Sequence, residues 1–345
     1  MDTVLFLSPV DPDGSLAKPA LEALAAAREL AAALSAPLAV GVFGAETAPA
    51  AKAVAGAGAV KHLAVQGPDF GSARYASDAA AWVALVQAAG ASIVIAPHTS
   101  RTARVAAGAT HRLGGRIDTH ATSVAASEGK PVVTRWFYRQ RMEALLSRPQ
   151  RPWVLLLDPG CVAPWQAQGA EPALEAVPVA LGERERRTAV RGTRAPVGEA
   201  QTIRPDAKLL FVAGAGWTKK QPDGVVHSAD AEKLILGFLD VAKASLGSSK
   251  SLVDQSGEGG QVLRFMSHLN QVGQTGSTPR HPKGLATCCH GEEPHVVGWR
   301  FVGERRAVNL DPNCGWARGK ADVLYVADAF AVIAKVNALL AAKKG

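Results

Sequence analysis

The chain has 345 residues, of which 48% are hydrophobic and 6% aromatic, and Lys and Arg exceed Asp and Glu by 8. This length allows two domains with separate cores, and an Ala- and Gly-rich, aromatic-poor composition is typical of close-packed α/β layers rather than of a β-sandwich. No apolar run approaches the roughly 20 residues of a membrane span, and no basic region or cleavage site marks a secretion signal. The sequence therefore predicts a cytoplasmic protein without membrane insertion.

Cysteine and charge patterns exclude two further classes. Four cysteines are too few and too irregularly spaced for a disulfide framework in a chain of this length. The basic excess is partly local, because residues 183–194 hold five arginines against two glutamates. No interleaved aromatics or known nucleic-acid module accompany these arginines, so we expect no nucleic-acid partner. The arginine-rich segment instead favours a solvated linker over residues 183–206.

The first part of the chain alternates short apolar runs with helical patterns, which predicts a mostly parallel sheet wrapped by helices. The expected strands are residues 4–10, 37–43, 60–65, 92–97, 131–138, 141–147 and 151–158, and the expected helices are residues 19–34, 77–90 and 102–115. No Gly-rich phosphate loop follows the first strand, where the sequence is SPVDPDGS. Residues 1–182 are therefore predicted to be an N-terminal α/β domain, with docking of a partner subunit as its role.

A second α/β domain is predicted over residues 207–345. Its expected strands begin at residue 208 and lie at 285–289, 305–310 and 322–327, and its expected helices are residues 228–247 and 329–344. Ser228 or Asp230 is placed to cap the first of these helices. Gly214 and Gly216 follow the first strand, but Lys219 stands where a dinucleotide fingerprint needs its third glycine, which argues against NAD binding.

The segment QVGQTG, residues 271–276, is the most informative loop of the chain. Its two glycines expose backbone N–H groups, its glutamines offer amide donors and acceptors, and Thr275 adds a hydroxyl. These groups suit a large polar ligand with many acceptor atoms. Such a loop by itself is also compatible with a simple turn.

QVGQTG, then AVNLDP at 307–312, and VADAF at 326–330 before a terminal helix together resemble the α subunit of electron transfer flavoproteins. The spacing from Gln271 to Asn309 matches that family without a gap, and SSKSLVDQSG at 248–257 resembles its upstream segment. The likeness extends over essentially the full chain. It implies two Rossmann-like α/β domains, of which the second binds FAD. It also implies an electron carrier without substrate turnover of its own, and hence without catalytic residues.

The resemblance assigns cofactor contacts residue by residue. The implied FAD-binding residues are Ser249, Lys250, Val272, Gly273, Gln274, Thr275, His290, Gly291, His295, Asn309 and Asp328. Residues 249 and 272–275 would hold FAD by hydroxyl, amide and backbone contacts, and Asn309 and Asp328 would hold its polar nucleoside end. His295 and Lys250 would place positive charge beside the reduced flavin. A surface histidine and a lysine opening a flexible loop are the simpler alternatives for these two.

Two departures from the family bear on the site. The loop CHGEEPH, residues 289–295, introduces Glu292 and Glu293, and acids near a flavin oppose its reduction. Ala215 stands where the family has an arginine, and Lys250 replaces a flavin-facing arginine without its planar fork. These changes keep open a second hypothesis, that the chain is a cofactor-free structural partner subunit of a redox complex.

Cys288, Cys289 and His290 invite a metal-site interpretation, but adjacent residues of a strand point to opposite faces and lack the spacing of zinc ligands. No metal-ligating residues are therefore predicted. The implied partners are a β subunit that usually carries AMP, a flavin-dependent dehydrogenase as electron donor, and a quinone reductase or similar acceptor.

Overall fold

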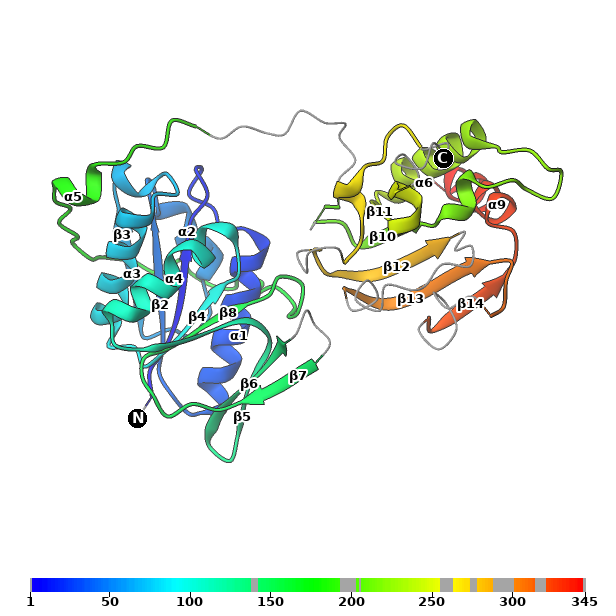
Figure 1. The fold of residues 1–345 in the computed structure, drawn as a ribbon. Helices are drawn as coiled ribbons and strands as arrows, with labels where there is room; N and C mark the ends of the chain where they lie inside the picture. The colour runs from blue at the N-terminus through cyan, green and yellow to red at the C-terminus, as the bar shows by residue number, and fades with distance from the viewer. Residues whose placement is uncertain are drawn as a thin grey trace. The chain divides into compact units, whose positions relative to one another are not determined.

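The computed structural model describes residues 2–137, 142–192, 203–204, 206–254, 263–273, 278–287, 301–313 and 321–343. The chain divides into two compact units, Met1–Arg194 and Ala195–Gly345 (Figure 1). The division falls inside segment 183–206. No helix among the described residues is long and apolar enough to cross a membrane.

Unit 1 contains one sheet of nine strands in the order β7-β6-β5-β8-β4-β1-β2-β3-β9. All neighbouring strands are parallel except β5 with β6 and β6 with β7, which are antiparallel. The strands are β1 Val4–Pro9, β2 Leu38–Gly44, β3 Lys61–Gln66, β4 Ile93–Pro97, β5 Arg116–Ser127, β6 Lys130–Phe137, β7 Met142–Leu146, β8 Trp153–Leu157 and β9 Glu175–Ala176. The predicted mostly parallel α/β sheet is confirmed.

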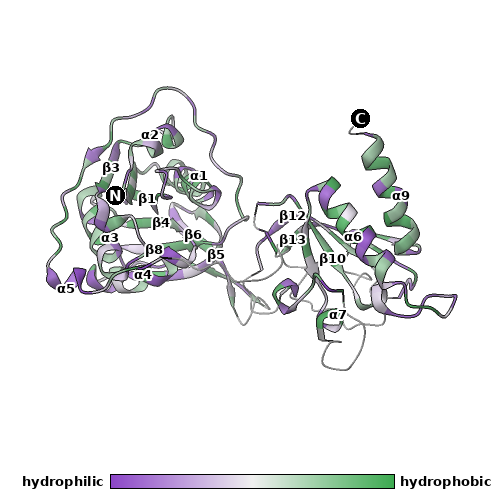
Figure 2. Ribbon diagram, turned by 90° about the horizontal axis from the view of Figure 1, so that it is seen from above, coloured by the Kyte–Doolittle hydropathy of each residue, from purple (hydrophilic) through white to green (hydrophobic). Residues whose placement is uncertain are grey.

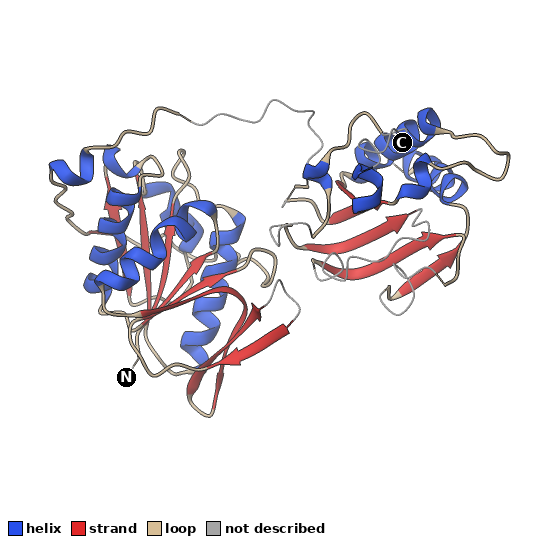
Figure 3. Ribbon diagram, in the orientation of Figure 1, coloured by secondary structure: helices blue, strands red, loops and turns tan. Residues whose placement is uncertain are grey.

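Helices cover both faces of this sheet (Figure 3). They are α1 Lys18–Ala33, α2 Ala48–Val54, α3 Tyr75–Ala89 and α4 Ser100–Arg112, with the short η1 Pro68–Phe70 and α5 Glu183–Arg186. Val4 and Phe6 of β1 pack in the core that includes α1 and α2, whereas Leu5 and Leu7 pack in the core that includes α3 and α4. Both faces of the central strands are thus buried, which explains their continuous apolar runs.

Strand β5 was not predicted from the sequence. Only Asp118 and Ala121 of this strand are buried, and from residue 122 to residue 127 partly buried positions alternate with exposed ones. Such a half-exposed strand lacks the continuous apolar run from which its neighbours were predicted. Its backbone is held in the sheet by antiparallel pairing with β6 in a hairpin and by parallel pairing with β8.

Unit 2 contains a sheet of five parallel strands in the order β11-β10-β12-β13-β14. The strands are β10 Leu209–Ala213, β11 Ser245–Ser248, β12 His281–Thr287, β13 Val302–Asn309 and β14 Val323–Val326. The helices are η2 Ala215–Thr218, α6 Ser228–Ala242, α7 Lys250–Asp254, η4 His268–Asn270 and α9 Ala329–Ala342. Helices α6 and α9 share one core with one face of the sheet, and α9 is hydrophobic along much of its length (Figure 2).

Three details of unit 2 correct the sequence prediction. The predicted helix 228–247 ends at Ala242, because Lys243 adopts a left-handed conformation with φ of 50°, and the chain then forms β11. The predicted cap at Ser228 or Asp230 is wrong, since His227 occupies the N-cap position. Strand β12 begins at His281, four residues before the predicted strand.

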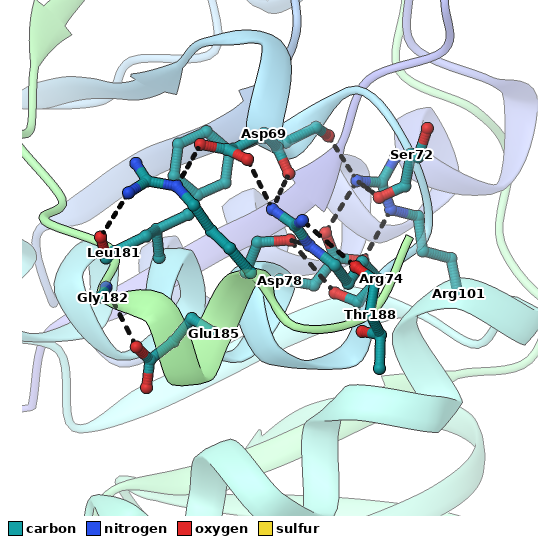
Figure 4. A network of polar contacts seen from close by, with 12 residues as sticks. Asp69, Ser72, Arg74, Asp78, Arg101, Leu181, Gly182, Glu185 and Thr188 are labelled. Carbon is teal, nitrogen blue, oxygen red and sulfur yellow. Dashed lines mark hydrogen bonds and ion pairs between the residues drawn. The ribbon is translucent and has the colours of Figure 1, made fainter. Parts of the chain in front are cut away.

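A network of arginines and carboxylates holds the start of segment 183–206 against unit 1 (Figure 4). Asp69 accepts from Arg74 Nη2 at 2.7 Å and from Arg186 Nε at 3.1 Å. Arg74 also donates to the carbonyl oxygen of Thr188, and Arg186 to that of Leu181. Hydrogen bonds from Arg74 and Arg186 lower the pKa of Asp69. Arg186, one of the five arginines of residues 183–194, is therefore paired with a carboxylate inside unit 1.

Candidate cofactor site

Those residues singled out by the sequence that the structure describes lie at one edge of the unit 2 sheet. Because all five strands are parallel, their carboxyl ends lie at the same edge. The chain passes from β10 to β11 on one side and then to β12 on the other, so the strand order reverses between β10 and β12. In open α/β sheets ligands bind in the crevice outside such a reversal.

Ser248 ends β11 at this edge and Ser249 follows it, and their hydroxyls have different surroundings. Ser249 Oγ accepts the backbone N–H of Leu252 at 3.2 Å and so starts α7, while its own N–H donates to Ala213 O at 2.9 Å. Ser248 is fully buried, and its Oγ has no hydrogen-bond partner among the described residues. A buried hydroxyl left unpaired costs about 1–3 kcal/mol. Sequence reasoning selected Ser249 and missed Ser248.

Val272 fixes the start of the QVGQTG loop against β11. Its side chain is buried in a core with Leu210, and its N–H donates to Ser248 O at 3.0 Å. A Cβ at Gly247 would lie 2.5 Å from Val272 Cγ2, so this close approach requires glycine. The Val272 side chain is therefore a packing group, and only its backbone is available to a ligand.

Gly273 follows Val272 in a conformation that favours glycine. Its φ of 80° lies in the left-handed region that favours glycine, and its N–H donates to Thr278 Oγ1 at 2.8 Å. Five of the predicted contacts lie outside the described residues: Gln274, Thr275, His290, Gly291 and His295. The same holds for Glu292 and Glu293.

Asn309 is the last residue of β13. Asp328 follows the end of β14 at the same edge. The two segments are joined by a hydrogen bond from Ala327 N to Asn309 O at 3.1 Å. Asp328 is the N-cap of α9, where its carboxylate oxygens accept from Phe330 N at 3.1 Å and Ala331 N at 3.3 Å. Asp328 thus serves the helix directly, and each of its oxygens keeps further acceptor capacity.

Trp217 and Phe330 pack beside the end of β12. Trp217 is fully buried, and its Nε1–H donates to Thr287 Oγ1 at 2.9 Å. The centroids of the Trp217 and Phe330 rings are 4.5 Å apart. Ala215, which replaces the family arginine, is also fully buried. Lys250, the first residue of α7, is exposed and supplies positive charge at the edge.

The structure therefore brings the described predicted residues together in two groups. Ser249, Lys250, Val272 and Gly273 lie on the β11 side, and Asn309 and Asp328 lie at the ends of β13 and β14. Neutral donors and acceptors dominate, with one cation and one carboxylate. This set fits an extended polar ligand that is held at several points.

Comparison with known protein families assigns the chain. The family model for the electron transfer flavoprotein domain matches residues 4–181, which is more than half of the chain. No curated protein matches it. The matched region corresponds to nearly all of unit 1, with its nine-stranded sheet and flanking helices. The chain belongs to the electron transfer flavoprotein family.

Proposed function

We propose that the chain is the α subunit of an electron transfer flavoprotein. It binds FAD at the carboxyl edge of the unit 2 sheet and carries electrons from a flavin-dependent dehydrogenase to a quinone reductase or similar acceptor. FAD supplies the redox chemistry when bound. The residues of this chain bind it, orient it and set the charge around it, without substrate turnover of their own.

The unpaired hydroxyl of Ser248 is the observation that carries this proposal. Ser248 lies at the end of β11, its backbone O accepts the N–H of Val272, and the two residues QV open the loop that resembles the family's FAD-binding motif. Native structures rarely leave a buried hydroxyl without a partner, so a polar ligand atom is the expected partner. The reversal of strand order at the same edge supports this assignment.

Lys250 and His295 have the proposed role of setting the electrostatics of the site. Lys250 is exposed at the edge to which Ser248 and Ser249 belong. Positive charge there stabilises negative charge on the reduced cofactor, because opposite charges a few ångströms apart attract even in partly solvated sites. His295 takes this role through the family resemblance.

A partner subunit is part of the proposal. The edge strand β7 exposes Met142 and Leu145, and the edge strand β14 exposes Tyr325 and Val326. Exposed apolar residues on unpaired strand edges favour association with another chain. We propose a heterodimer with a β-type subunit that carries AMP, in which unit 1 provides the docking surface.

The test compares two serines of the same strand in the full chain co-expressed with a β-type subunit. Ser248→Ala removes the unpaired hydroxyl and its desolvation cost, so the flavin-free protein should be at least as stable as the wild type while FAD affinity falls about 5- to 10-fold. Ser245→Ala is the matched control, because Ser245 Oγ accepts from Arg204 N at 2.6 Å at the opposite end of β11. It lowers stability by about 1 kcal/mol and leaves FAD affinity unchanged.

Flavin absorption and cofactor extraction read the result. A yellow complex containing FAD supports the α-subunit assignment, and a colourless complex supports the structural-partner alternative. Equal FAD affinity in the two serine variants contradicts the placement of the cofactor at β11.

A further inference from the structure

A second polar cluster lies at the carboxyl edge of the unit 1 sheet, on three adjacent strands. His98 follows β4, His120 lies within β5, and Asp158 follows β8, and these strands stand in the order β5-β8-β4. Asp158 Oδ1 is 2.8 Å from His98 Nδ1 and 3.2 Å from His120 Nδ1. The two imidazole rings meet edge to face with centroids 4.4 Å apart. Two histidines therefore converge on one carboxylate oxygen.

The backbone holds these residues in place. His98 N donates to Leu157 O, and Asp158 N donates to Ala121 O, both at 2.8 Å. His120 has φ of 57°, in the left-handed region that costs a non-glycine residue about 1–2 kcal/mol, at an irregularity in the pairing of β5 with β8. The surrounding sheet thus maintains a strained backbone that directs His120 toward Asp158.

The three side chains differ in how far solvent reaches them. The side chains of His98 and Asp158 are 15% and 13% exposed, whereas that of His120 is 46% exposed. The cluster is therefore anchored on its inner side and open to solvent on the side of His120.

We propose that His98, His120 and Asp158 form a binding site for a divalent transition metal ion, for which Zn²⁺ is the probe. One ligand atom from each residue lies within 4.8 Å of the other two. Imidazole nitrogens select zinc and its neighbours in the first transition row over magnesium and calcium, which prefer oxygen ligands. Two histidines and one carboxylate form a ligand set found in zinc enzymes.

The spacing needs only a small adjustment. Ligands at about 2.1 Å from a tetrahedral zinc lie about 3.4 Å from one another. The present Nδ1 to Oδ1 distances of 2.8 and 3.2 Å are those of hydrogen bonds. The ion takes the place of the protons in these two bonds, and side-chain rotation opens the distances by several tenths of an ångström. Three protein ligands leave one coordination position for water or a group of another molecule.

The alternative is a hydrogen-bonded triad that never holds a metal, and titration of the full chain separates the two. After treatment with a chelator, the chain is titrated with Co²⁺, followed by its ligand-field absorption, and then with Zn²⁺ in competition. We expect one ion per chain at this site. His120→Ala should weaken Co²⁺ binding at least tenfold. Because the His120 side chain is half exposed, the fold should tolerate this change.

Two histidines serve as matched controls. His111→Ala changes an exposed histidine of α4 in unit 1. His227→Ala changes a surface histidine of unit 2 whose Nε2 lies 2.7 Å from Asp223 Oδ2. Both variants should bind Co²⁺ like the wild type. Zn²⁺ should also raise the Tm of the wild type and of both controls, but not that of His120→Ala.

The proposal is overturned if the wild type takes up no Co²⁺ and shows no Tm rise with Zn²⁺ at millimolar concentration. It is equally overturned if His120→Ala and His98→Ala bind as tightly as the wild type. Loss of binding in His227→Ala alone would place the ion in unit 2 and would also contradict it.

Discussion

The two units bury different kinds of polar groups in similar sheets. Among the described residues, unit 1 buries three carboxylates, Glu22, Asp78 and Asp118, as well as the hydroxyl residues Ser8, Thr47, Ser77, Thr102 and Thr110. Unit 2 buries no carboxylate among its described residues. Its buried polar residues carry hydroxyl or amide groups, apart from one histidine: Thr218, Ser245, Ser248, Ser249, Asn270, Gln271, Thr278, His281, Thr287 and Asn309. Most of the unit 2 set lies at or beside strand ends.

This difference bears on the role of each unit. A buried carboxylate is stable only when cations or N–H donors of the protein compensate it, so the buried acids of unit 1 are already paired. Neutral hydroxyls and amides cost less to bury and form hydrogen bonds to a ligand without fixing its charge. Under the two proposals above, each unit would bind its ligand at the carboxyl edge of its sheet, and the side chains at the strand ends would determine which ligand that is.

The largest expected effect tests the pairing inside unit 1. Asp118 accepts from Arg135 Nη1 at 2.9 Å, Arg148 Nη2 at 3.0 Å and Trp153 Nε1 at 2.9 Å. Asp118→Ala leaves these donors uncompensated and should lower the free energy of unfolding of unit 1 by about 3–5 kcal/mol. Urea unfolding measures this loss. Asp223→Ala changes an exposed carboxylate and should leave stability nearly unchanged. Similar losses in both variants would contradict the comparison.

A smaller effect is expected at the edge of unit 2. In Gly247→Val the added Cβ would lie 2.5 Å from Val272 Cγ2 and 3.2 Å from Leu210 Cδ1. Overpacking of this kind costs about 1–3 kcal/mol. Displacement of Val272 should also release FAD from the co-expressed complex, measured by flavin absorption. Gly237→Ala in α6 should keep full flavin content, and a Gly247→Val variant that does the same would argue against a cofactor at this edge.

Acidification should affect unit 1 through Asp158. Its pKa in the folded state is about 2, below the ordinary value of 3.8. Its ionised form therefore stabilises the fold above pH 4, and this contribution of about 2 kcal/mol is lost as the pH falls from 4 toward 2. The unfolding free energies of wild type and Asp158→Asn, compared in the presence of a chelator, should converge over this range. A difference that stays constant with pH would contradict the assignment.

The sequence predicted those elements whose burial produces a recognisable local pattern of apolar residues. Strands β1, β2, β4 and β8 are continuous apolar runs, because helices cover both faces of the sheet. Strand β11 was missed because SLGS is short and continues an Ala- and Leu-rich helical pattern. Only tertiary pairing with β10 makes it a strand.

The residues proposed to bind the cofactor were selected because their motif is contiguous, whereas the histidine and aspartate cluster of unit 1 was missed because the sheet topology assembles it. Ser249 and the QVGQTG loop follow from a short recognisable segment. His98 and Asp158 are 60 residues apart, and they meet only because β4 and β8 are neighbours in the sheet. The unpaired hydroxyl of Ser248 likewise depends on burial, which no local pattern shows.

The smallest expected effect concerns Asp328, where structural and ligand roles coincide at the unit 2 edge. Asp328→Ala removes the N-cap of α9, whose carboxylate accepts from Phe330 N and Ala331 N, and should cost about 1 kcal/mol. Asp328→Ser keeps a capping oxygen and should change stability by only a few tenths of a kcal/mol. If the carboxylate also holds the nucleoside end of FAD, Asp328→Ser should lower FAD affinity severalfold, because a charged hydrogen bond is replaced by a weaker one or lost. Fluorescence titration with FAD and urea unfolding of both variants separate the two roles. Full FAD affinity in Asp328→Ser would restrict Asp328 to helix capping, and the cofactor contacts would then depend on the β11 side of the edge.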